Sequence, residues 1–139
     1  MLKERYEEYY FTGNYNCAEC IIRAANDEYN FGLNDTAMRM MAAYGAGMQC
    51  GNTCGAVTAC VAVLSLLYVE DRAHLSTDIR PVCTLFIRKV NAVYGSTLCK
   101  DIKPQTFKKE IRCQLTIEKV LACFEETVKE YEESRKNIF

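Results

Sequence analysis

The sequence predicts an all-α protein, a single-domain bundle of five to seven helices around one buried central helix. Apolar residues recur at helical spacing along the chain, and no long strand-like alternation is present. Residues that favour helix N-caps precede several of these segments, and glycines follow some of them. The length, 139 residues, suits one domain over residues 1–139, with a core that needs no disulfide bonds.

Each expected helix is bounded by a capping residue, a glycine or a polar link. Asn16 is the clearest N-cap, because Glu19 stands three residues later, as in a capping box. Gly95 ends a helix whose first turns contain Pro81, where proline is tolerated. Residues 103–104 predict a loop before the last helix. The expected helical segments are residues 2–12, 17 to about 30, 35–42, 53 to about 68, 77 to about 94, a single turn at 96–102, and 116–136.

One glycine-rich segment, residues 45–51, predicts a loop with positive φ angles at some of its glycines. Asn52 or Thr53 is expected to cap the helix that follows. That helix runs to about residue 68 and is apolar on nearly all sides. In a soluble domain this pattern is typical of a central, buried helix.

The charge and the scarcity of histidine exclude several functions. Lys and Arg total 17 and Asp and Glu total 18, so the formal net charge is −1. No excess of positive charge suggests a nucleic-acid partner. The single His excludes a Cys2His2 zinc finger and bis-His haem ligation by this chain alone. No C-x-x-C-H motif follows a cysteine pair, so a haem attachment site is not encoded.

Neither the N-terminal segment nor the apolar stretches of the sequence predict a membrane protein. Residues 1–8 are charged and lack the apolar run of a signal peptide. The longest apolar stretch, residues 60–69, is broken by Ser65 and is too short to span a bilayer. We therefore expect a cytoplasmic location, where thiols are kept reduced.

The compositional anomaly is the cysteine content, nine residues in 139. Because nine is odd, at least one thiol stays unpaired even if every other cysteine forms a disulfide. In a reducing compartment, metal or redox chemistry is favoured over structural disulfides.

Cys50 and Cys54 form the sharpest motif, with Gly47, Gly51 and Gly55 around them as expected loop support. Cys54 is expected in the first turn of the buried helix, where the dipole and the free N–H groups lower a thiol pKa. Cys50 is expected on the flexible loop just before it. This arrangement suits a redox pair with Cys54 as the attacking thiolate, and equally two ligands to one metal. The alternative is that both cysteines pack as small hydrophobic residues.

Three further cysteines occupy expected helix starts. Cys17 follows the Asn16 cap, Cys99 opens a short helical turn, and Cys113 stands beside Arg112, whose charge favours a thiolate. For Cys17 a functional role and simple packing are equally supported. The remaining cysteines lie on apolar helical faces and are expected to pack: Cys20, Cys60, Cys83 and Cys123. His74 is expected to be solvated, and a Cys–His nucleophile pair is a weaker alternative.

Four separated segments together resemble the family of redox-active proteins named for its C, GCAxxG, C, C signature (C_GCAxxG_C_C). The resemblance covers about residues 16–130. The core of the family's pattern is usually Cys-Gly-Ala-x-x-Gly, which begins here at Cys54, and Ala59 stands where its last glycine is expected. The matching segments are Asn16–Glu19, Gly47–Ala56, Tyr94–Cys99 and Arg112–Cys113.

The resemblance implies a small helical protein with redox-active cysteines, of which Cys50, Cys54, Cys99 and Cys113 are the functional set and Cys17 is next. A similar domain occurs in split-Soret cytochromes beside haem and an iron–sulfur centre, so an iron–sulfur cluster is also implied as a candidate cofactor.

Two classes of function are therefore expected. The first is a cysteine-based redox protein, using thiol–disulfide or electron-transfer chemistry with an unidentified redox partner, or binding an iron–sulfur cluster or zinc through the same cysteines. The second is a non-catalytic helical interaction module, which dimerises through its aromatic N-terminal segment, residues 6–11.

Overall fold

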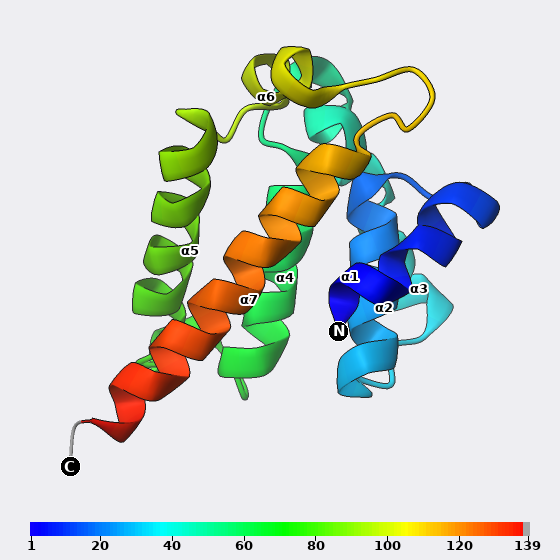
Figure 1. The fold of residues 1–139 in the computed structure, drawn as a ribbon. Coiled ribbons are helices and arrows are strands. Elements are labelled where there is room, and N and C mark those ends of the chain that lie inside the picture. The colour runs from blue at the N-terminus through cyan, green and yellow to red at the C-terminus, as the bar shows by residue number, and fades with distance from the viewer. Residues whose placement is uncertain (138–139) are drawn as a thin grey trace.

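Seven α-helices make up most of residues 1–137, which the computed structural model describes. The all-α prediction is confirmed, since the only β pairings in this range are isolated bridges. Figure 1 shows α6 lying across the end of the bundle at which α4 and α7 begin. The α-helices are α1 (Leu2–Glu7), α2 (Cys17–Tyr29), α3 (Asp35–Arg39), α4 (Gly55–Tyr68), α5 (Ile79–Tyr94), α6 (Cys99–Thr106) and α7 (Gln114–Lys136).

Helix α4 is the central helix, as its composition predicts. It packs against α2, α5 and α7, and most of its first ten residues are buried. Burial of such apolar side chains is the main stabilising contribution to a fold of this size. The helix is not covered all round, because Leu66 in its last turn is 43 % exposed.

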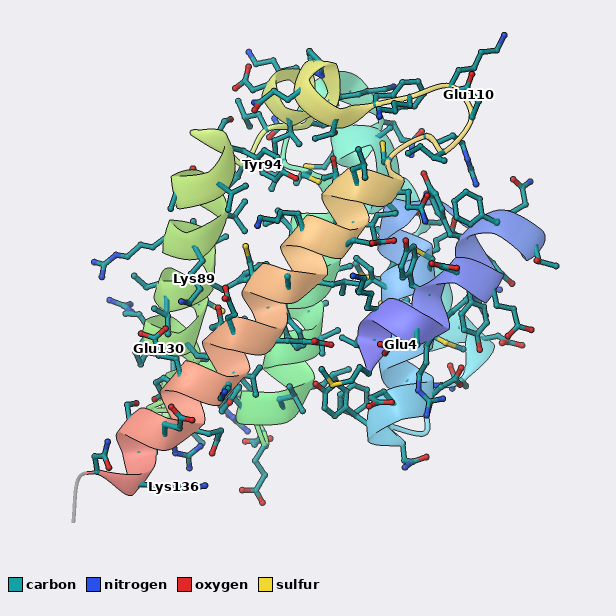
Figure 2. The ribbon with its side chains drawn as sticks, viewed as in Figure 1. Glu4, Lys89, Tyr94, Glu110, Glu130 and Lys136 are labelled. Atoms are coloured by element: carbon teal, nitrogen blue, oxygen red, sulfur yellow. The ribbon has the colours of Figure 1, made fainter. Side chains whose placement is uncertain are left out.

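Helices α5 and α7 form the layer on one side of α4. Phe86 and Phe124 meet edge to face between them, with ring centroids 6.4 Å apart. At the edge of this contact the Lys89 ammonium lies 2.7 Å from the Glu130 carboxylate (Figure 2). This partly exposed ion pair contributes little to stability, so the apolar contact holds the two helices together.

The N-terminal aromatic segment covers the bundle from the other side. α1 continues into a π-helical turn, η1 (Glu8–Thr12), and both Tyr6 and Tyr10 are buried in the core of the same chain. The Tyr6 hydroxyl donates to the Glu118 carboxylate on α7 at 2.6 Å. This segment therefore joins the beginning of the chain to its last helix.

The predicted helix boundaries are right where a local capping signal sets them. Asn16 accepts from the N–H groups of Ala18 and Glu19, and Glu19 completes the capping box. Gly95 ends α5 with a φ of 72°, which a residue with a side chain rarely adopts.

Several boundary predictions are wrong. Helix α3 ends at Arg39 instead of residue 42, and α5 begins at Ile79, two residues later than predicted. The N-cap of α4 is Cys54, because residues 52–53 pair with another segment instead of starting the helix. Pro104, which was expected in a loop, lies inside α6, in its last turn. Because proline has no N–H group, the carbonyl of Lys100 four residues earlier lacks its helical donor, and Lys100 is exposed. Helix α7 begins two residues earlier than predicted, with Cys113 as its N-cap.

None of the helices in residues 1–137 combines the length and the apolar character needed to cross a membrane.

Candidate functional site

Four cysteines from four separate segments line one cavity of about 160 Å³: Cys17, Cys54, Cys99 and Cys113. The first residues of α2 and α6 are Cys17 and Cys99, and the N-caps of α4 and α7 are Cys54 and Cys113. Each cysteine therefore lies at the amino-terminal end of a helix. Unpaired N–H groups and the helix dipole favour negative charge at such ends. Figure 1 shows these helices starting at the same end of the bundle.

A short backbone pairing holds Cys54 and Cys99 beside this cavity. The Cys54 N–H donates to the Thr97 carbonyl at 2.8 Å, and the Cys99 N–H donates to the Asn52 carbonyl at 2.7 Å. These two bonds flank an antiparallel bridge between residues 53 and 98. Because the bonds are made by the cysteine backbones themselves, the backbones of the two residues keep a fixed relation to each other.

Cys17 lies against the start of α4. A Cβ placed on Gly55 would be only 2.6 Å from the Cys17 sulfur, so no side chain fits at this position without a shift. Gly55 follows Cys54 directly, which brings the sulfur of Cys17 next to the backbone that carries Cys54. The glycine thus allows the close approach of two segments that are far apart in the sequence.

The glycine-rich loop closes over Cys99. Gly47 has a φ of 62°, and a Cβ there would lie 2.4 Å from the Asn52 carbonyl oxygen and 2.6 Å from the Cys99 Cβ. Positive φ angles also occur at Ala46, Met48 and Gln49, which the sequence does not reveal because these residues rarely adopt them. Gly51 has a φ of 77°, and a Cβ there would lie 3.4 Å from the Cβ of Lys100 on α6.

Tyr10 and Arg112 surround Cys113. The Cys113 N–H donates to the Tyr10 hydroxyl at 3.0 Å. The Arg112 guanidinium lies 4.1 Å from the centre of the Tyr10 ring and donates to the Tyr10 carbonyl at 2.8 Å. The Arg112 cation stacks on the Tyr10 ring, and the hydroxyl of the same tyrosine bonds to Cys113. Cys113 therefore has fixed neighbours, one of which is positively charged.

Burial raises the pKa of three cavity thiols in the reduced protein. It raises the pKa of Cys54 to about 12, although the N–H groups of Val57 and Ala56 act in the opposite direction. The pKa of Cys17 and that of Cys113 are raised as well, mainly by burial and also by the neighbouring thiols. The prediction that helix starts lower these pKa values is therefore wrong, because desolvation outweighs the helix dipole.

Cys50 lies outside the cavity. It is exposed on the glycine-rich loop, and its thiol donates to the Gly47 carbonyl at 3.6 Å. The cavity brings Cys54 together with Cys17, Cys99 and Cys113, and not with Cys50. Of the cysteines predicted to pack, Cys20, Cys60 and Cys123 are buried and Cys83 is half-buried.

The four cavity cysteines have the donor chemistry of a zinc or iron–sulfur site, but not the geometry of one. Within residues 1–137 no three or more His, Cys, Asp or Glu side chains are arranged to hold a metal ion. All nine cysteines are free thiols in the structure. The four thiols share one cavity without forming such a group in the described part of the chain.

Sequence reasoning missed several residues of the cavity wall. Asn16 was expected only as a helix cap, yet it lines the cavity beside Cys17. Tyr10, Lys103, Phe107 and Thr116 carry no motif that marks them. The one signal in the sequence for a residue of the cavity wall was the positive charge next to Cys113, which identified Arg112.

Residues 15–127 match the model of the family described as "Putative redox-active protein (C_GCAxxG_C_C)". The match confirms the resemblance and covers all four cavity cysteines. The signature in this description contains four cysteines, the same number that line the cavity. Comparisons with curated proteins and with solved structures gave no match.

Proposed function

We propose a thiol–disulfide redox function for this chain, which belongs to the C_GCAxxG_C_C family of redox-active proteins. The observation that carries the proposal is the cavity in which four helix-start cysteines meet. Thiols spread over the surface or through the core would not exchange with one another. Thiols that share one cavity can form a disulfide after small movements.

Cys99 is the thiol that meets the incoming disulfide. It lines the cavity and also a hollow on the outer surface, so it connects the buried thiols with solvent. Its sulfur attacks one sulfur of the incoming disulfide, forms a mixed disulfide, and releases the other half as a thiolate that takes up a proton.

Cys54 completes the reaction. Its sulfur attacks the Cys99 sulfur, a Cys54–Cys99 disulfide forms, and the second half of the substrate leaves as a thiol. Two protein thiols are thus oxidised, and one substrate disulfide is reduced to two thiols. The backbone pairing of residues 52–54 with 97–99 keeps the two cysteines close throughout.

The raised pKa values support a role for the buried thiols in the second step, in which the protein disulfide forms, and not as the first nucleophile. With a pKa of about 12, Cys54 stays protonated at neutral pH and reacts slowly with electrophiles from solution. It reacts once the mixed disulfide lies beside it, and its proton passes to the departing substrate thiolate. Disulfide formation removes this thiol without leaving a buried charge, so the oxidised cavity carries no desolvation penalty.

Cys50 is a second possible disulfide partner for Cys54, and the sequence motif suggests this pairing. It is exposed and belongs to the strained loop that covers Cys99. A Cys50–Cys54 disulfide requires this loop to move, whereas Cys54 and Cys99 already lie on paired backbone segments and line the same cavity, so small side-chain and backbone shifts suffice.

The test is to map disulfides after oxidation. Reduced protein is treated with one equivalent of a small disulfide, the free thiols are alkylated, and linked peptides are identified by mass spectrometry. We expect a Cys54–Cys99 link, which is lost in Cys54→Ser and in Cys99→Ser and is unchanged in Cys83→Ser. A Cys50–Cys54 link would replace the pairing but keep the redox function. If no link forms among the four cavity cysteines and Cys50, the proposal is wrong.

A further inference from the structure

The cavity opens towards a cluster of positive charge. It shares Cys99, Lys103 and Phe107 with the outer hollow, which Lys100 also lines. Arg112 lies on the wall of the cavity itself. Neither the cavity nor the hollow has an aspartate or glutamate among its lining residues.

These cations are not neutralised by carboxylates of the same chain. Among the ion pairs of residues 1–137, none involves Lys100, Lys103 or Arg112. The Lys103 ammonium lies 4.8 Å from the centre of the Phe107 ring, and Arg112 lies over Tyr10. Both cations keep donors for a ligand, because an aromatic face accepts no strong hydrogen bond.

The charge is a local feature. Residues 99–113 contain five basic and two acidic residues, whereas the whole chain has a net charge of −1. One of the two acids, Asp101, accepts a hydrogen bond from the Ser96 hydroxyl at 2.7 Å. Figure 2 shows the other, Glu110, on the loop between α6 and α7. A hollow lined by one sign of charge concentrates ions of the opposite sign.

The two spaces differ in character. The cavity is small, about 160 Å³, and Ile102, Phe107 and Ile117 give it a mainly apolar wall around the sulfur atoms. The hollow outside carries the lysines. A fitting ligand therefore has an apolar, sulfur-containing part for the cavity and negative groups for Lys103, which lines both spaces, and for Arg112 on the cavity wall.

We infer that the substrate is a small disulfide with carboxylate groups, which Lys103 and Arg112 hold while its sulfur atoms lie beside Cys99. The inference rests on the proposed redox function and names the class of molecule that this function serves. The reaction is the exchange described above, with the carboxylated disulfide as the oxidant. It releases two carboxylated thiols and leaves one protein disulfide.

The test compares three disulfides of similar size and different charge. They are 3,3′-dithiodipropionate, which is anionic, 2-hydroxyethyl disulfide, which is neutral, and cystamine, which is cationic. The rate at which each oxidises the reduced protein is measured at low and high salt. We expect the anionic disulfide to react about tenfold faster than the cationic one at low salt, with the difference shrinking at high salt. The same three rates are also measured on the protein unfolded in denaturant, where the thiolates repel the anionic disulfide. Their order there is the reference for the folded protein.

Charge variants locate the effect. Lys103→Gln should remove most of the preference for the anionic disulfide, measured as the ratio of its rate to that of the neutral one. Lys136→Gln removes a charge at the far end of α7 (Figure 2) and should change neither rate.

The outcomes separate the two proposals. If all three disulfides oxidise cavity cysteines at rates in the order of the unfolded protein, the substrate inference is wrong and the redox function stands. If none oxidises a cavity cysteine, the redox function itself is wrong. A preference that survives in Lys103→Gln would overturn the placement of the carboxylates.

Discussion

The sulfur of Cys17 occupies the space that a side chain at residue 55 would need. A Cβ on Gly55 would lie 2.6 Å from this sulfur and 2.8 Å from the Tyr44 carbonyl oxygen. Cys17 begins α2 and Gly55 begins α4, so this contact sets how closely the two helix starts approach. It is also what brings Cys17 to the cavity of Cys54.

Gly55→Ala should therefore destabilise the protein by about 1–3 kcal/mol, the usual range for overpacking a filled space. Urea unfolding of the reduced protein measures this change. In the double variant Gly55→Ala/Cys17→Ala the sulfur is gone, and part of the loss should be recovered. The recovery is incomplete because the Tyr44 carbonyl stays in place. Equal destabilisation with and without the sulfur would show that Cys17 does not fill this space.

Asn16→Ala should lower the free energy of unfolding by about 1–2 kcal/mol, because Asn16 caps α2 and also donates to the Ala42 carbonyl at 2.9 Å. It should also make Cys17 alkylate faster, since the cap fixes the residue that carries this thiol. Asn34→Ala, at the exposed N-cap of α3, is the matched control. It should cost less and leave the alkylation of Cys17 unchanged.

Tyr10→Phe should raise the pKa of Cys113 further. The Tyr10 hydroxyl bonds to Cys113 and lowers this pKa against the effect of burial. Alkylation of Cys113, followed by mass spectrometry over a range of pH, should show a slower reaction at each pH. Tyr9→Phe is the control, because the Tyr9 hydroxyl bonds to Asp27 at the surface. Unchanged alkylation of Cys113 in Tyr10→Phe would mean that the hydroxyl does not stabilise its thiolate.

The reduced protein should lose stability at alkaline pH. The pKa of Cys54 rises from 9.0 to about 12 on folding, so above pH 9 the unfolded chain releases a proton that the folded protein keeps. Stability from this thiol is complete below pH 9 and falls by about 1.4 kcal/mol per pH unit above it.

Urea unfolding of the wild-type protein and of Cys54→Ala between pH 7 and pH 11 measures this effect. The difference in unfolding free energy between the two should be constant up to pH 9 and then shrink. A difference that stays constant to pH 11 would contradict the raised pKa.

Local signals in the sequence were enough to predict much of the fold. Asn16 and Gly95 set their helix boundaries through bonds and φ angles of neighbouring residues, so the prediction needed no tertiary information. The start of α4 was missed for the opposite reason. Its preceding residues pair with residues 97–99, a contact that no local pattern encodes.

The same distinction applies to the site. Cysteine positions at helix starts could be found from capping patterns, and these are the residues that meet in the cavity. The pKa values of these cysteines could not be predicted from capping patterns, because the burial that raises them depends on how four segments pack. Cys50 was singled out because it is near Cys54 in the sequence, yet the loop φ angles keep it outside the cavity.

The hydrogen bond between Tyr10 and Cys113 joins residues 103 positions apart. During synthesis the N-terminal segment and α2 leave the ribosome long before residue 113 does, so the cavity is still missing a wall when Cys17 and Cys54 have already emerged. The missing wall is supplied by α6, by the segment that follows it and by the start of α7, which contribute Ile102, Phe107 and Ile117 to the cavity. The closing of the thiol site is thus a late event in folding, and protection of Cys54 from alkylation should report that the segment up to residue 117 has emerged and docked.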